Sequence, residues 1–269
     1  MKKFYQYFGI MVIMLFSFYY TEKIAVLMQK KDPLYQEIEA SKVNEEITSV
    51  NAIIDGDYIV PGVNGLSVNA HKSFQKLKSF GVFNRYYLFF DQVVPEISLE
   101  NNKDKIIKEG NKQKKSVAIV LEYNEEKIDY LKNKNKNFSV LVTSESRKTD
   151  ATYEQINHDF KNYKEVDKEL DKNSQNVHIC IIDSSNLETC KKNKKYLVEK
   201  NLELNSTNIA KIKGNISSGS IIFVNQTATT VDLDILLKQI DSQGLKVTSL
   251  STLILEANEK DWYLSFFLL

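Results

Sequence analysis

The residues whose side chains could do chemistry are few. The 269-residue chain has three histidines, His71, His158 and His178, and two cysteines, Cys180 and Cys190. None of the histidines belongs to a local Ser-His-Asp or Cys-His motif, and no glycine-rich loop of the phosphate-binding kind is present. The sequence therefore offers no nucleophile motif and no phosphate site.

The three histidines have different surroundings. His178 lies in the apolar run VHICIID, so we expect a buried core histidine. His71 precedes a predicted helix and is expected to cap it or to lie at the surface. His158 has polar neighbours, which favours an ordinary surface or helix-flanking residue over a metal ligand.

The two cysteines lie on adjacent predicted elements. Cys180 lies on a strand predicted over residues 177–183, and Cys190 on a helix predicted over residues 186–199. If this helix packs on the strand, the two Cα atoms come within about 7 Å and a disulfide can form. Such a bridge would contribute about 3 kcal/mol in the chain-entropy model. The alternative is a pair of buried free thiols.

The charge of the chain is balanced. It has 36 basic and 35 acidic residues, which leaves no electrostatic footprint for a phosphate backbone. We therefore expect no nucleic-acid partner. The two short basic stretches, residues 112–115 and 191–195, are predicted to be solvated surface.

The N-terminus has the order of a signal sequence. Lys2 and Lys3 precede an apolar run over residues 8–20, but no cleavage site with small residues follows. We therefore predict that residues 1–29 form an uncleaved signal anchor, a single transmembrane helix; a buried core helix is the alternative. Residues 30–48 are predicted to be a polar stalk. The expected location is the cell membrane, with the bulk of the chain outside the cytoplasm.

Residues 49–100 predict a small α/β module. Phe74, Leu77 and Phe80 have helical spacing, and residues 86–94 predict a buried strand. Pro61-Gly62 and Asn64-Gly65 predict two tight turns. The charged stretch over residues 101–115 is the predicted domain boundary.

Residues 116–256 predict a second domain in which strands and helices alternate. Apolar stretches at residues 116–123, 138–143, 177–183, 219–225 and 246–250 predict strands. Helices are predicted between them, among them residues 231–243, which end at Gly244 in the position that favours a left-handed stop. This alternation favours a mostly parallel sheet or barrel. The apolar tail, residues 257–269, predicts an edge strand, a membrane-interface contact or a partner contact.

Several blocks in this order resemble the NodB-homology polysaccharide deacetylases. They are GSIIFVN from Gly219 and GLKVTSLSTLI from Gly244, together with residues 116–124 and FSVLVTSE from Phe138. Residues 60–74 also resemble a membrane-proximal module that precedes such domains. The resemblance implies an irregular (β/α) barrel, and active members remove acetyl groups from peptidoglycan or chitin-like glycans.

The same resemblance assigns the site residues. Its catalytic base falls on Glu122, and its three metal ligands fall on Tyr123, His158 and Asn162. Its late acid histidine falls on Asn225. Only one of the three metal ligands is retained, whereas a tight zinc-type site needs three. We therefore expect no metal cofactor, a vestigial base at Glu122, and vestigial substrate-binding positions at His158, Asn162 and Asn225.

These expectations leave three hypotheses. The first is a catalytically inactive, membrane-anchored protein of the cell envelope that binds cell-wall glycan or acts as a scaffold. The second is an active metal-dependent deacetylase of peptidoglycan or a related N-acetylated glycan, which uses zinc or a similar divalent ion in a rearranged site. The third is a structural envelope protein with no ligand.

Overall fold

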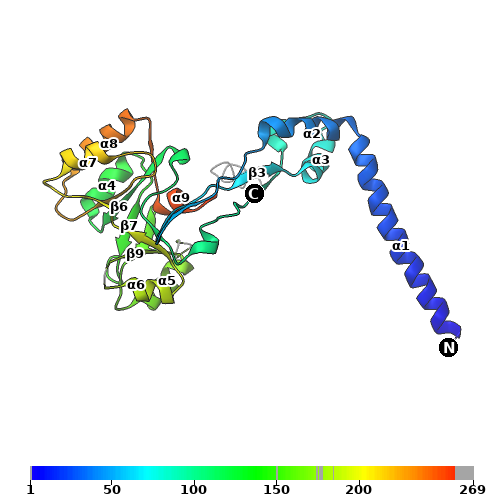
Figure 1. The fold of residues 1–269 in the computed structure, drawn as a ribbon, viewed down its shortest axis with the longest axis horizontal. Coiled ribbons are helices and arrows are strands. Elements are labelled where there is room, and N and C mark those ends of the chain that lie inside the picture. Colours follow the sequence, from blue (N-terminus) through cyan, green and yellow to red (C-terminus); the bar gives the residue numbers. More distant parts are fainter. Residues whose placement is uncertain (1, 150, 174, 176–177, 184, 258–269) are drawn as a thin grey trace. The chain divides into compact units, whose positions relative to one another are not determined.

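The computed structural model describes the chain from residue 2 to residue 257 except residues 150, 174, 176–177 and 184 (Figure 1). It contains two compact units. One unit contains the residues up to Thr48 together with Gly65–Val93, and the other contains Ser49–Asn64 together with the residues from Val94 onward. The division differs from the predicted one, because residues 49–64 and 94–100, predicted in the small module, belong to the unit of the barrel, and so does the predicted boundary over residues 101–115. The predicted apolar tail lies almost wholly outside the described residues.

The first unit has its own small core. Its elements are α1 (Lys2–Lys31), α2 (Pro33–Glu45), β3 (Gly65–Val68), α3 (Ala70–Lys78), a 3-10 turn at Arg85–Tyr87 and β4 (Phe90–Val93). Ile38 of α2 is fully buried against Phe74 and Leu77 of α3. Residues 30–48, predicted as a stalk, therefore supply part of a core. The predicted buried strand at 86–94 is also wrong, because within the described part of the chain β4 pairs with β3 and its residues are largely exposed.

The prediction of a membrane anchor is contradicted. Among the described residues, no helix is both long enough and apolar enough to cross a membrane. Residues 8–20, before the charged pair Glu22 and Lys23, would extend only about 20 Å as a helix. A bilayer core is about 30 Å thick. The predicted single-pass cell-membrane localisation is therefore wrong.

Both predicted tight turns are also wrong. Neither Gly62 nor Gly65 has a positive φ, and Gly65 begins β3. The hairpin turn lies instead at Gly56, whose φ is +59°, between β1 (Ile53–Asp55) and β2 (Tyr58–Val60). Gly62 is required for a different reason, because a Cβ there would collide with the backbone carbonyl of Val50.

The second unit contains two sheets with mostly parallel pairing. One sheet has the strand order β1-β2-β5-β10-β9, and the other has the order β11-β12-β6-β7-β8 with β13 also paired to β6. The remaining strands are β5 (Ile106–Ile107), β6 (Ser116–Glu122), β7 (Ser139–Val142), β8 (Glu154–Asn157), β9 (Ile179–Ile182), β10 (Tyr196–Glu199), β11 (Leu202–Leu204), β12 (Ile221–Val224) and β13 (Lys246–Thr248). The helices are α4 (Glu125–Asn133), α5 (Tyr163–Lys172), α6 (Leu187–Lys192), α7 (Ile209–Asn215), α8 (Thr230–Ser242) and α9 (Leu250–Ile254), with 3-10 turns at Glu100–Asn102 and Lys112–Lys114.

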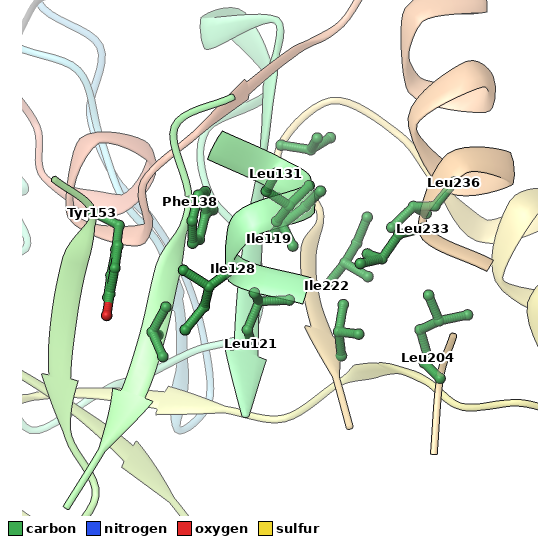
Figure 2. Close-up of a cluster of buried hydrophobic side chains, with 14 of the residues drawn as sticks. Ile119, Leu121, Ile128, Leu131, Phe138, Tyr153, Leu204, Ile222, Leu233 and Leu236 are labelled. Carbon is green, nitrogen blue, oxygen red and sulfur yellow. The ribbon is translucent and has the colours of Figure 1, made fainter. Parts of the chain in front are cut away.

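Alternate residues of the strands pack into two different cores. Val117 and Ile119 of β6 belong to a cluster shared with α4 and α8, where Leu131 lies next to Ile119 and Leu233 lies toward Ile222 (Figure 2). Ala118 and Val120 belong to a second cluster. That second cluster draws on both sheets and includes Leu141, Ile156, Ile179, Ile181, Val198, Ile221 and Phe223. The two sheets therefore enclose one interior with helices outside it, which confirms the predicted irregular (β/α) barrel.

The end of α8 confirms one predicted helix boundary, and the end of α6 contradicts another. α8 begins with a capping box of Thr229 and Asp232, and Gly244 follows its end with a φ of +68°, as predicted. The helix predicted over residues 186–199 ends early, at Lys192. Lys194 has a φ of +54°, and the chain then enters β10.

Candidate functional site

Four charged or titratable side chains lie at the carboxyl ends of barrel strands. Glu122 ends β6, whereas His158, Asp183 and Lys200 each follow directly after β8, β9 and β10. Each continues the alternation of the residues that face the interior of the barrel, such as Val120 before Glu122. The carboxyl end of a barrel is the edge at which such proteins build their sites. We call these four residues the carboxyl-end cluster.

An ion pair between Glu122 and Lys200 joins the two sheets within this cluster. The Lys200 Nζ lies 3.5 Å from Glu122 Oε1. The other carboxylate oxygen, Oε2, accepts a hydrogen bond from the Gln226 backbone N–H at 3.1 Å. The Lys200 ammonium also lies 5.9 Å from the ring centroid of Phe223, an interior residue of β12. The position predicted as a catalytic base is therefore occupied by a carboxylate that is already paired with a cation.

His158 is half-buried, and its surroundings favour the neutral form of its side chain. Burial lowers the pKa of His158, and the positive charge of Lys200 lowers it further, whereas Asp183 and Glu122 act in the opposite direction. The Nδ1 atom is buried, and no described residue forms a hydrogen bond with it. The ring packs edge-on against Phe160, with 5.1 Å between centroids. His158 is therefore not the ordinary surface residue that its polar neighbours predicted.

Asp183 supplies a second carboxylate to the cluster. Its Oδ1 accepts hydrogen bonds from the N–H of Ser185 at 2.7 Å, the hydroxyl of Ser185 at 2.6 Å and the N–H of Asn186 at 3.1 Å. These bonds lower the pKa of Asp183. The side chain is exposed, so it carries its negative charge where solvent and ligands can reach it.

Three positions assigned by resemblance are used in local structure instead. The Asn162 N–H and side-chain amide both donate to Asp159, at the start of α5. The Asn225 Oδ1 accepts from the Thr227 N–H at 2.9 Å. Tyr123 packs against the outer core and donates its hydroxyl to a neighbouring glutamate. Of the predicted site residues, the structure brings Glu122 and His158 together at the cluster.

A buried lysine holds the loop beside Glu122. Lys127 of α4 is only 3% exposed, and its ammonium donates to the backbone carbonyls of Asn225 at 2.7 Å and Gln226 at 3.0 Å. Burial lowers the pKa of Lys127. Gln226 in turn donates its side-chain amide to the Tyr123 carbonyl at 2.8 Å. Lys127 thus fixes the loop after β12, and that loop fixes the Glu122 carboxylate.

Sequence reasoning missed Lys127, Asp183 and Lys200. Asp183 was the last residue of a predicted strand, so the rule that sites lie at strand ends could have identified it. Lys200 was not recognised as a residue at a strand end, because the segment that forms β10 was predicted as part of a helix. His178, predicted as a core histidine, is exposed before β9 begins.

The residues of the cluster do not fit a divalent metal. Within the described part of the chain, no three His, Cys, Asp or Glu side chains are grouped so that they could hold a metal ion. The Lys200 ammonium already supplies the positive charge next to Glu122, and it would repel a second cation.

The two cysteines are close enough to be joined. Cys180 on β9 and Cys190 on α6 are both fully buried, with their Cα atoms 5.8 Å apart. The structure pairs them as a disulfide. The separation lies within the limit expected from the predicted packing of the helix on the strand.

Comparison with known proteins identifies the fold. No protein-family model matches the chain. The structure resembles that of BA3943, a CE4 family pseudoenzyme from Bacillus anthracis, with a TM-score of 0.56, 21% identity, and coverage of 84% of this chain and 96% of that one. This chain has the fold of a CE4 family protein. The resemblance to polysaccharide deacetylases is therefore confirmed for the fold.

Two further proteins are similar to this chain. A BA3943 mutant, described as a CE4 family pseudoenzyme with restored enzymatic activity, matches with a TM-score of 0.56 and 22% identity over 84% of this chain and all of that chain. The uncharacterized protein YlxY of Bacillus subtilis (strain 168) is 38% identical over 92 residues. These residues are 34% of this chain and 29% of YlxY, so the match spans less than a third of that relative.

Proposed function

We propose that this deacetylase-like barrel has no deacetylase activity and acts as a glycan-binding or scaffolding module for cell-wall glycan. The observation that carries the proposal is the ion pair between Lys200 and Glu122. Metal-assisted hydrolysis needs a site that holds an ion with an open position and a carboxylate available to accept a proton from water. In this cluster a lysine neutralises the carboxylate, and the described residues contain no group that could hold a metal ion.

The fold neighbours support the proposal. BA3943 is described as a pseudoenzyme, and a mutant of it is described as having restored enzymatic activity. BA3943 therefore has this fold without enzymatic activity, and a mutant of it has regained the activity. We propose the same relation between fold and activity for this chain.

The first experiment tests for activity. The purified full chain is incubated with peptidoglycan and with chitin oligomers in the presence of zinc, cobalt or manganese, and released acetate is measured. Elemental analysis measures the metal that stays bound. We expect no acetate above background and no stoichiometric metal. Acetate release that is lost in Glu122→Ala or His158→Ala, but kept in Asp129→Asn on the exposed face of α4, would establish the active deacetylase instead.

The second experiment tests for binding. The full chain is mixed with insoluble peptidoglycan, and the bound fraction is measured after centrifugation. We expect retention that decreases in Asp183→Asn and is unchanged in Asp129→Asn. A chain that stays entirely in the supernatant would favour a structural protein without a glycan ligand.

A further inference from the structure

The carboxyl-end cluster contains hydrogen-bonding groups that its own residues do not use. A lysine ammonium has three N–H donors, and that of Lys200 makes no hydrogen bond to any described residue. Its contact with Glu122 is a long ion pair of 3.5 Å. The Nδ1 of His158 has no hydrogen-bond partner among the described residues, but it is buried and is therefore not offered to a ligand. Asp183 accepts all its hydrogen bonds through Oδ1, which leaves Oδ2 open within the described structure.

The Lys200 side chain is held in place. It is 27% exposed, so solvent and ligands reach part of it. Its ammonium contacts both the Phe223 ring and the Glu122 carboxylate. Glu122 is itself fixed by Gln226, whose loop is tied to the buried Lys127. The ammonium is therefore presented in a defined position rather than on a free surface chain.

The charges of the cluster restrict the chemistry of its ligand. An anionic group would face the carboxylates of Glu122 and Asp183, whereas a cationic group would face the ammonium of Lys200. A neutral amide meets neither repulsion. Its carbonyl oxygen can accept from an ammonium N–H, and its own N–H can donate to a carboxylate oxygen or to an imidazole nitrogen. In amino-sugar glycans, the acetylated amine is such an amide.

We infer that Lys200 is the specificity-determining residue of this site, and that its ammonium binds the acetyl carbonyl oxygen of an N-acetylated sugar. The open oxygen of Asp183, whose side chain is exposed, is the group suited to the amide N–H. This inference rests on the proposed glycan-binding function. It assigns recognition to the acetyl group and involves no bond cleavage.

Calorimetric titration of the full chain tests the inference. The ligands are an N-acetylglucosamine oligomer and the fully deacetylated oligomer of the same length. The acetylated oligomer should bind about tenfold more tightly, which is the magnitude of one charge-assisted hydrogen bond. Lys200→Met, which removes the donors but keeps an unbranched chain, should weaken binding of the acetylated oligomer about tenfold and remove the preference.

Three further variants complete the experiment. Lys200→Arg should keep most of the affinity, because a guanidinium also donates to a carbonyl. Lys200→Gln keeps one uncharged donor group and should lose an intermediate part of the affinity for the acetylated oligomer. This variant replaces Lys200→Met in the test if the methionine variant does not fold. Lys246→Met is the matched control, because this exposed lysine lies at the amino end of β13, and it should bind as the wild type does.

The outcomes separate the inference from the proposed function. If the wild type binds the acetylated oligomer and Lys200→Met binds it equally well, the role of Lys200 is wrong, although glycan binding stands. If the wild type prefers the deacetylated oligomer, the carboxylates select the ligand and the inference is wrong. If the wild type binds neither oligomer, both the inference and glycan binding fail.

Discussion

The Glu256 carboxylate should contribute measurably to the stability of the barrel unit. This residue is 9% exposed, and its Oε1 accepts two backbone hydrogen bonds, from Gly62 at 2.9 Å and from Leu99 at 2.8 Å. Gly62 follows β2 and Leu99 precedes β5, so Glu256 holds two segments that lie far from it in the chain. Replacement by alanine leaves two buried donors without an acceptor, at a cost of about 1–3 kcal/mol each. Because entering water can satisfy part of this loss, we expect Glu256→Ala to lower the free energy of unfolding by about 3 kcal/mol.

Glu256→Gln separates the hydrogen bonds from the charge. Glutamine keeps a carbonyl oxygen as acceptor, so this variant should lose only about 1 kcal/mol. Urea unfolding followed by circular dichroism measures the midpoint, and an unchanged slope shows that the loss lies in stability. Amide hydrogen exchange at Gly62 and Leu99 reports the two bonds directly. Glu145→Ala, in an exposed loop, is the control. If Glu256→Ala unfolds at the wild-type midpoint and retains protection of both amides, the assigned role of the carboxylate is wrong.

Three other predictions test the fold and its charges. Gly219 has a φ of +91° and lies where a Cβ would collide with a backbone carbonyl, so Gly219→Ala should lower the free energy of unfolding in urea by at least about 3 kcal/mol. The control is Gly214→Ala, whose added Cβ has no atom within 4 Å, and it should raise the free energy of unfolding by about 0.5–1 kcal/mol. Because the pKa of His158 is lowered in the folded chain, the unfolded chain binds the proton at a higher pH, and the free energy of unfolding should fall as the pH decreases below 6.5. A His158→Gln variant with the same pH dependence of stability as the wild type would disprove this. Reduction of the Cys180–Cys190 bridge should lower unfolding free energy by about 3 kcal/mol, and complete alkylation of both thiols without reductant would show that no bridge forms.

The barrel strands could be predicted because they are buried on both faces. Residues 116–123, 138–143 and 219–225 are nearly continuous apolar runs, and the structure places β6, β7 and β12 within them. A strand covered on one side by helices and on the other by the barrel interior needs such a run. The end of α8 at Gly244 was equally clear, because only a residue tolerant of positive φ suits that position.

The site was only partly predictable, because one of its residues follows a strand with no such signal. β10 is four residues long and comes directly after the lysine-rich end of α6. Lysine is compatible with a helix, and the left-handed turn at Lys194 has no glycine or proline to mark it. Lys200 was therefore assigned no role, although it decides the charge of the cluster. The prediction for the first unit was wrong for a related reason, because a core as small as that around Ile38 needs few apolar residues and leaves little hydrophobic periodicity in the sequence.

The pairing of β6 sets the order in which the barrel unit can be completed during synthesis. β6 lies early in this unit, yet Ala118 pairs with Ile221 of β12, and Ser116 pairs with Lys246 of β13. Contacts between residues so far apart in the chain form slowly, because a long loop must close before either strand is held. An emerging chain therefore carries β6, whose residues are almost all apolar, without its final neighbours until the last strand has left the ribosome. β6 can first be enclosed when β13, up to Thr248, has emerged from the ribosome, and a chain stopped before β12 presents an open apolar edge for aggregation.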